Sequence, residues 1–149
     1  MAWRTLIVGD LDAKLSPAEL KVIEGSDSAS THVASAISTM VDMVRGYVAS
    51  SPHNYEMGTV GTIPERLMEP TLCALVPKLY SRSAGLLIDM NDVRKDEASE
   101  AIKLFRDVAG GRFRVEVATE TSDEDSSSSV SVVQAGTGSD LTFDNLKGL

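Results

Sequence analysis

The 149-residue sequence contains few of the residues from which catalytic and metal sites are built. Its one cysteine, Cys73, can form no disulfide within the chain, which favours synthesis in a reducing compartment. Cys73 lies on the apolar face of a predicted helix, as a small buried residue would. The two histidines, His32 and His53, lie far apart, and no Cys, His and carboxylate spacing is typical of zinc. We therefore expect no metal ion, no cofactor and no enzymatic activity.

Aromatic residues and long apolar runs are also scarce. Phe, Trp and Tyr make up 5% of the residues and hydrophobic residues 42%, so the core is expected to be aliphatic. The only tryptophan, Trp3, is expected to anchor the N-terminus to the body. The apolar stretch 6–8 is too short for a signal peptide, and no run approaches the length of a membrane span. The sequence therefore predicts one domain, made soluble in a cytoplasm.

Positive charge is in short supply. The chain has 14 Lys and Arg against 22 Asp and Glu, which gives a net charge of −8 and an isoelectric point near 4.7. Six of these acids and one base fall in residues 118–149, so this tail carries −5 and the remaining chain −3. Such a balance disfavours a nucleic-acid backbone or an anionic membrane as the partner of the surface.

Hydrophobic periodicity predicts a mainly helical body. Residues 16–19 begin a short helix, with Ser16 as N-cap, Pro17 at the first helical position and Glu19 closing a capping box. A longer helix is expected over about residues 29–50. Its apolar stripe, at spacings of three and four residues, consists of Val33, Ile37, Met40, Val41, Val44 and Val48.

The second half of the body continues this pattern after a loop at residues 51–62. A short turn is expected to end near Glu69, followed by a helix from Pro70 with a kink near Pro77. A last helix is expected over Asp92–Ala109. Together these elements predict a small bundle of about four to five helices.

The chain changes character after this last helix. Gly110 and Gly111 end it, and residues 112–117 alternate polar and apolar side chains, which predicts a short strand. A lone strand in a helical chain would add to another chain's sheet edge or lie extended on a surface. We assign residues 1–117 to the helical domain and residues 118–149 to a flexible, acidic, Ser-rich arm.

The arm contains two kinds of segment. Residues 119–131 have low hydrophobicity and high charge and are predicted to be disordered when free. The last residues carry spaced apolar anchors typical of a docking peptide, although a tail folding back on its own body remains open. These anchors are Leu141, Phe143, Leu146 and Leu149.

Three stretches together carry a family resemblance. They are Val-Arg-Gly-Tyr-Val-Ala at 44–49, the Pro-led helix 64–82, and residues 95–113, which read Lys-Asp-Glu-Ala-Ser-Glu-Ala-Ile-Lys-Leu-Phe-Arg-Asp-Val-Ala-Gly-Gly-Arg-Phe. The chain resembles, over roughly residues 1–117, the phage head–tail adaptor (head-completion or connector) proteins of the phage Mu-like group. In that family a final helix of the type Ala-Ile-x-x-Leu-x-x-Ile-Ala-x-Gly precedes a short strand, as residues 101–111 do here. The acidic tail, the two internal prolines and the longer 51–61 loop depart from the family.

The resemblance implies a structural protein of the virion neck, made in the host cytoplasm. Such adaptors form a ring, usually of twelve copies, between the portal protein and the stopper or tail-completion protein, and DNA passes through the channel without sequence-specific binding. The loop residues His53, Asn54 and Tyr55 would face the stopper or tail. The residues that would reach the portal or a neighbouring subunit are Arg112, Phe113, Arg114, Val115, Val117, Leu141, Phe143, Leu146 and Leu149.

A different class of function fits the same composition. A small acidic regulatory module, antitoxin-like or a DNA mimic, would act through its disordered tail. That reading predicts that tail removal abolishes partner binding and that no ring forms. Neighbouring genes distinguish the two, since portal and capsid genes favour the adaptor and a toxin gene favours the regulatory module.

Overall fold

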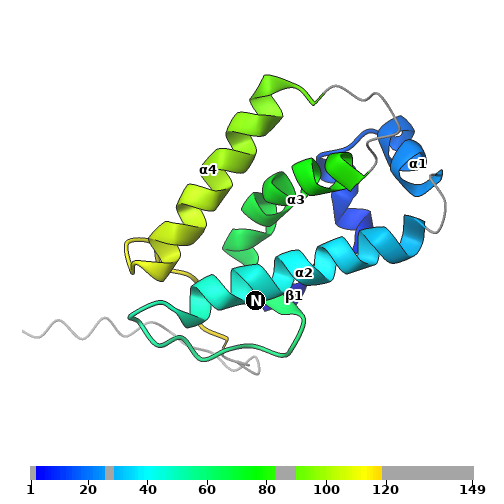
Figure 1. Cartoon of the computed structure of the whole chain (residues 1–149). Helices are drawn as coiled ribbons and strands as arrows, with labels where there is room; N and C mark the ends of the chain where they lie inside the picture. Colours follow the sequence, from blue (N-terminus) through cyan, green and yellow to red (C-terminus); the bar gives the residue numbers. More distant parts are fainter. Residues whose placement is uncertain (1–2, 26–28, 83–89, 119–149) are drawn as a thin grey trace, which may run out of the picture.

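A computed structural model describes residues 3–25, 29–82 and 90–118 of the chain (Figure 1). The predicted mainly helical fold class is confirmed. Helix α3 packs between α2 and α4, and α1 packs against α2 (Figure 1). In chain order the elements are β1 (Trp3–Thr5), the 3-10 helix η1 (Val8–Ala13), α1 (Pro17–Gly25), α2 (Ala29–Ala49), β2 (Thr62–Pro64), the 3-10 helix η2 (Glu65–Leu67), α3 (Met68–Arg82) and α4 (Asp92–Ala109).

The core is largely aliphatic, as the composition predicts. The predicted stripe of α2 is buried along its whole length, from Val33 to Val48. Phe105 of α4 is fully buried and its ring stacks on Tyr47 of α2, with 5.9 Å between the ring centroids. Because α2 contains glycine and several β-branched valines, packing of this stripe rather than intrinsic propensity holds the helix.

Helix α1 begins with the predicted capping box. The Ser16 backbone N–H donates to Oε2 of Glu19 at 2.7 Å, and the Glu19 N–H donates to Oγ of Ser16 at 3.3 Å. Helix α4 spans the predicted residues, and Asn91 caps it by accepting a hydrogen bond from the Val93 N–H at 2.7 Å. Both caps satisfy backbone donors that have no partner within their helix.

Helix α3 differs from its predicted boundaries. It begins at Met68, two residues before the expected start at Pro70, and continues through Pro77 to Arg82. Pro70 lies in the first turn, where a backbone N–H has no partner within the helix, so the missing donor costs little there. Pro77 removes one donor from the helix interior, but the buried neighbours Val76 and Leu79 pack the helix against the core.

The predicted strand at residues 112–117 is wrong. These residues are extended, but they lie in no ladder, and the strands of the described residues are β1 and β2. Those two pair antiparallel, with Trp3 opposite Pro64 and Thr5 opposite Thr62. The alternation at 112–117 reflects one face packed on the body, since Val115 is 6% exposed while Arg114 is exposed. Of the two possibilities for a lone strand, the chain adopts the extended path over a surface.

A polar cluster joins α4, α3 and α1 at the start of α4. Nη1 of Arg94 donates to Oε1 of Glu19 at 2.8 Å, and Nη2 donates to the Lys14 carbonyl at 3.2 Å. The Tyr80 hydroxyl also donates to Oε1 of Glu19, at 2.7 Å. The Arg94 hydrogen bond is the main reason why the pKa of Glu19 is lowered from 4.5 to about 2.

This cluster predicts a pH-dependent contribution to stability. Because the pKa of Glu19 is lower in the folded chain, the contribution is complete above about pH 4.5 and is lost as pH falls towards about 2. Glu19→Gln should lower the free energy of unfolding by about 2 kcal/mol at pH 7, and the difference from wild type should shrink between pH 4.5 and 2. Urea denaturation at several pH values measures this. The exposed Glu24 of the same helix, as Glu24→Gln, is the control, and an equal loss there would contradict the assignment.

Candidate functional site

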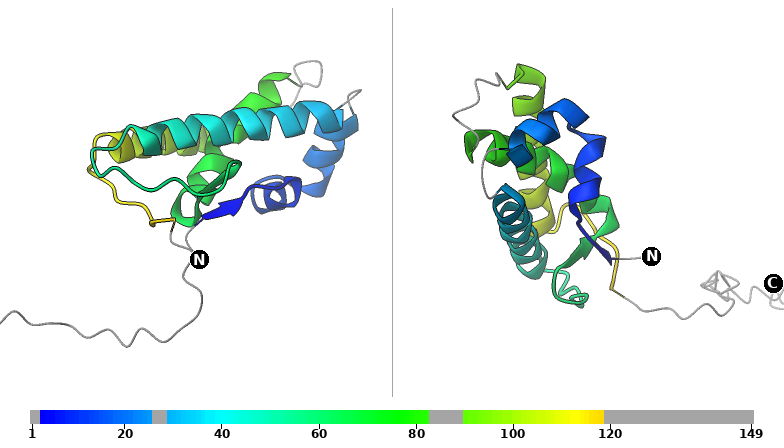
Figure 2. Two further views of the ribbon diagram at one scale, coloured as in Figure 1. Left: turned by 90° about the horizontal axis from the view of Figure 1, so that it is seen from below. Right: turned by 90° about the vertical axis from the view of Figure 1, so that its right-hand side faces the viewer.

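The two chain segments predicted to contact partners lie side by side at one end of the bundle (Figure 2). One is the loop at residues 51–61, which follows α2, and the other is the extended segment 111–118, which follows α4. The family resemblance implied different partners for them, the stopper or tail for the loop and the portal or a neighbouring subunit for the segment. We call the region in which they meet the loop–segment junction.

The segment begins at a glycine that no other residue would replace without strain. Gly111 has φ of +74°, and a Cβ built on it would lie 2.6 Å from Cγ of Pro52 in the loop. Its carbonyl accepts a hydrogen bond from Nε2 of His53 at 3.0 Å. The end of α4 is therefore fitted closely against the loop.

Residues 115 and 116 are held by side chains from three different elements. The Val115 N–H donates to the Tyr55 hydroxyl at 3.2 Å, and the indole Nε1 of Trp3 donates to the Glu116 carbonyl at 3.0 Å. The Glu116 carboxylate pairs with Nε of Arg66 at 2.9 Å and accepts from the Arg66 backbone N–H at 3.4 Å. The segment is thus held by side chains from β1, the loop and η2, and the Val115 side chain is buried.

The second half of the loop is held by one arginine of α2. Nη1 of Arg45 donates to the carbonyls of Thr59 at 2.9 Å and Thr62 at 2.6 Å, and Nη2 donates to the Gly58 carbonyl at 3.0 Å. The same guanidinium lies over the Trp3 ring, 5.5 Å from its centroid. Gly58 is required here because a Cβ would lie 2.9 Å from that ring. Arg45 therefore fixes both the loop and the indole that binds the segment.

The structure divides the predicted contact residues of the segment into two groups. Phe113 and Val115 pack against the chain's own body and are not free to meet a partner as the segment stands. Arg112 and Arg114 are exposed, although Arg112 pairs with Asp107, and Val117 is 50% exposed. The remaining predicted contacts lie outside the described residues: Leu141, Phe143, Leu146 and Leu149.

The predicted loop residues also prove to have different roles. His53 and Tyr55 hold the segment, and their rings lie 5.7 Å apart. Asn54 is exposed and adopts φ of +48°, a conformation that asparagine tolerates well. Further along the loop, Val60 is 88% exposed. Pro52, Glu56 and Thr59 of the loop are exposed as well.

Of the side chains that build the junction, sequence reasoning gave Trp3 an anchoring role, assigned His53 and Tyr55 to a stopper or tail contact, and missed Arg45 and Arg66. The anchoring role of Trp3 is confirmed by its contacts with Glu116, Arg45 and Gly58. Arg45 and Arg66 gave no signal of their own, because a charged residue outside an apolar stripe is usually solvated. The one hint was the position of Arg45 within the Val-Arg-Gly-Tyr-Val-Ala stretch.

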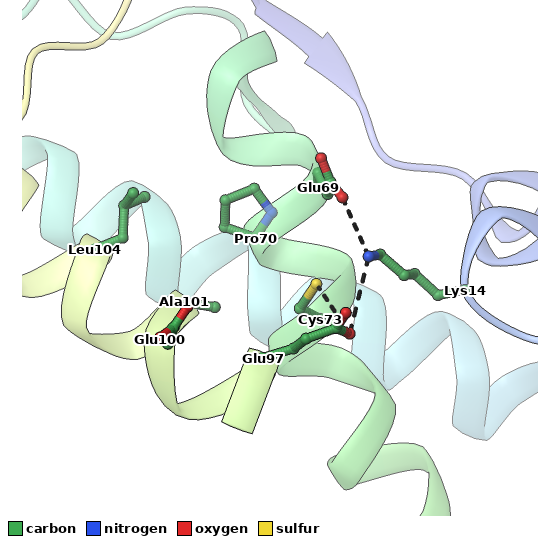
Figure 3. Close-up of a pocket in the computed structure, with 8 residues that line it drawn as sticks. All are labelled: Lys14, Glu69, Pro70, Cys73, Glu97, Glu100, Ala101 and Leu104. Carbon is green, nitrogen blue, oxygen red and sulfur yellow. Dashed lines mark hydrogen bonds and ion pairs between the residues drawn. The ribbon is translucent and has the colours of Figure 1, made fainter. Parts of the chain in front are cut away.

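A separate hollow of about 250 Å³ lies between α3 and α4 beside Lys14 (Figure 3). Nζ of Lys14 lies 3.1 Å from Oε1 of Glu69 and 3.9 Å from Oε2 of Glu97, and the Glu69 hydrogen bond raises the pKa of Lys14. Burial raises the pKa of the half-buried Cys73 thiol, so the thiol is protonated and a weak nucleophile at neutral pH. The hollow is lined by Lys14, Glu69, Pro70, Cys73, Glu97, Glu100, Ala101 and Leu104.

Within residues 3–25, 29–82 and 90–118, no group of three or more His, Cys, Asp or Glu side chains is placed to hold a metal ion. None of the helices in these ranges has both the length and the apolar character needed to cross a membrane. Comparison with family models, with curated proteins and with solved structures finds no match.

The buried side chain of Val115 should hold the segment against the body. Val115→Ala should lower the free energy of unfolding by about 2 kcal/mol, since two methyl groups are lost and a void remains. Because Trp3 is the only tryptophan and binds the neighbouring Glu116, its fluorescence reports the same contact, and acrylamide should quench it more strongly in the variant. Val117→Ala, at a 50% exposed position two residues on, is the control and should change both quantities little. Equal effects of the two variants would contradict this role for Val115.

The three carbonyl contacts of Arg45 require a planar group with several donors. Lysine keeps the charge but presents a single ammonium, so Arg45→Lys should lower the free energy of unfolding by about 2 kcal/mol. Amide hydrogen exchange at residues 58–62 should accelerate, because the loop loses its attachment to α2. Arg106→Lys, at an exposed position of α4, is the matched control. Unchanged exchange in the loop would show that Arg45 does not hold it.

Proposed function

We propose that this chain is a structural virion protein, a head–tail adaptor whose copies form a ring between the portal and the stopper or tail of a tailed phage. Its resemblance to the adaptor family over residues 1–117 is the starting point. The observed course of α4 fits that resemblance: the helix ends at Gly110 and Gly111 and passes directly into an extended segment. Both the helix and its termination belong to the stretch that carries the resemblance.

The observation that carries the proposal is the loop–segment junction. A protein that joins two rings needs a surface ordered before binding, because ordering a loop on contact reduces affinity. Here Arg45 fixes the loop and Trp3, Tyr55 and Arg66 fix the segment. Exposed side chains at this end come from both parts. The loop contributes Pro52, His53, Asn54, Glu56, Thr59 and Val60, and the segment contributes Arg112, Arg114 and Val117.

The charge distribution supports the same role. With a net charge of −8, the chain repels a DNA backbone, which suits a channel through which DNA passes without being bound. The exposed Arg112 and Arg114 would then meet acidic groups of a protein partner. The hollow beside Lys14 offers no activated nucleophile, since burial raises the pKa of the Cys73 thiol and Lys14 is paired with Glu69.

Cryo-electron microscopy of the neck in purified virions of the parent phage tests the proposal. The expected result is a ring of this helical body directly below the portal, with residues 111–118 at the contact with the portal or a neighbouring copy. A phage with a nonsense mutation in the gene should accumulate filled heads and separate tails, and the wild-type gene supplied in trans should restore joined particles.

A neck built without this chain would overturn the adaptor role. The acidic regulatory module would then be the favoured function. That alternative has its own measurement, because removal of residues 119–149 should abolish partner binding if the tail acts as the inhibitory element. A variant that retains binding without the tail would exclude the alternative as well.

A further inference from the structure

The first half of α4 buries none of its side chains. From residue 91 to residue 100 every side chain is exposed or half-buried, and Val93 is 60% exposed. The buried residues of the helix are Ala101, Phe105 and Val108, which all belong to its second half. In Figure 1 the first turns of α4 stand clear of the ribbons of α2 and α3. Within this helix, apolar packing on the core is therefore confined to the second half.

Polar contacts hold the first half instead. Nη1 and Nη2 of Arg94 donate to the two carboxylate oxygens of Glu19 at 2.8 and 3.2 Å, and Nη2 also donates to the Lys14 carbonyl at 3.2 Å. The Arg94 guanidinium also donates to the Tyr80 hydroxyl and lies 5.8 Å from the centroid of that ring. One turn further on, Oε2 of Glu97 lies 3.9 Å from Nζ of Lys14. Two charged side chains thus attach this half of the helix to α1, α3 and residue 14.

These contacts are open to screening by dissolved ions. The side chains of Arg94 and Glu19 are 28% and 23% exposed, so water and ions reach the pair. The screening length falls from about 10 Å at 0.1 M salt to about 3 Å at 1 M, which is close to the length of the contacts themselves. The pKa of Glu19 is about 2, mainly because of the Arg94 hydrogen bond, so the pair stays charged at neutral pH. Ionic strength is therefore the condition that acts on it.

We propose that the first half of α4, residues 92–100, is a lid that an electrostatic latch holds closed. The latch consists of Arg94 with Glu19 and of Glu97 with Lys14. The lid opens by unwinding, while the second half of the helix stays packed on the core. Local opening of this kind is expected where a segment has an exposed backbone and few buried apolar contacts. The inference does not depend on the adaptor role, because it concerns a motion within one copy of the chain.

Opening of the lid changes the hollow beside Lys14 (Figure 3). Glu97 and Glu100 of the lid line the α4 side of the hollow, together with Leu104 from the half that stays packed. Cys73 lines the opposite side, and its Sγ lies 4.0 Å from Oε2 of Glu97. An open lid therefore widens the hollow and makes the thiol more accessible.

Native-state amide hydrogen exchange of the full-length chain, followed residue by residue by NMR, tests the lid. Amides of residues 96–100 should exchange through local opening, so urea below the unfolding transition should change their rates little. Amides of residues 104–108 should exchange through global unfolding and accelerate steeply with urea. The same urea dependence in both sets would show that α4 opens as one unit, and would overturn the lid.

Two neighbouring substitutions with the same change of charge test the latch. Arg94→Met should accelerate exchange at residues 96–100 by about tenfold, because the charged hydrogen bonds to Glu19 are lost. Lys95→Met removes a base whose ion pair, with Asp92, lies within the helix, and should change these rates less than about twofold. Equal effects of the two substitutions would overturn the role of Arg94.

Salt separates an electrostatic latch from a merely structural contact. Raising NaCl from about 0.05 to 0.5 M should accelerate exchange at residues 96–100 in wild type and in Lys95→Met, and much less in Arg94→Met. Glu19→Gln, with Glu24→Gln as its control, removes the other charge of the pair and should give the same pattern if Arg94→Met folds poorly. A salt response that persists in both Arg94→Met and Glu19→Gln would contradict the latch.

Cys73 provides a second readout, because it is the only cysteine. At low salt, an uncharged maleimide should label its thiol about fivefold faster in Arg94→Met than in wild type or Lys95→Met, since the open state becomes more populated. Equal labelling rates in the three proteins, alongside faster exchange at residues 96–100 in Arg94→Met, would show that the lid does not cover the hollow.

Discussion

One side chain, the indole of Trp3, joins the three parts of the loop–segment junction. Its N–H binds the Glu116 carbonyl, its face receives the Arg45 guanidinium, and its edge leaves room only for a glycine at position 58. Pairing of β1 with β2 fixes the backbone that carries the indole. The N-terminal strand, the loop and the C-terminal segment therefore depend on one another through a single residue, and a change at any of them will be felt at the other two.

At each end of the bundle, one arginine binds several hydrogen-bond acceptors at once. Arg45 binds three carbonyls of a loop, and Arg94 joins Glu19, Tyr80 and the Lys14 carbonyl across three elements. A guanidinium suits both places, because its planar group carries five donors and satisfies several acceptors at once. Although the chain is acidic overall, part of its tertiary structure therefore depends on Arg45 and Arg94.

Most of the helical body could be predicted, because the buried apolar residues of a helix recur at regular spacing in the sequence. The stripe of α2, the capping box at Ser16 and the bounds of α4 all follow from residue spacing and local hydrogen bonding. The start of α3 was predicted two residues too late. Proline is common at the first position of a helix, but Pro70 occupies the third position of α3. Local rules therefore succeed where the partner of a residue lies within one or two turns.

The junction could not be predicted, because its contacts depend on residues far apart in sequence. Alternation at residues 112–117 correctly indicated one buried face at Val115, but it does not tell whether the backbone will find a neighbouring strand. No residue spacing in the sequence predicts the pairing of β1 with β2 or the carbonyl contacts of Arg45 either. The segments expected to meet two partners therefore turned out to contact each other.

The order in which these contacts can form gives the junction its physical character. Trp3 and Glu116 are 113 positions apart, so their contact can form only after the body between them has been brought together. A contact that closes one of the longest loops of the chain, and that relies on one buried valine and a few hydrogen bonds, lies at the low end of local stability. The junction is therefore expected to be less stable than the core formed by α2, α3 and α4.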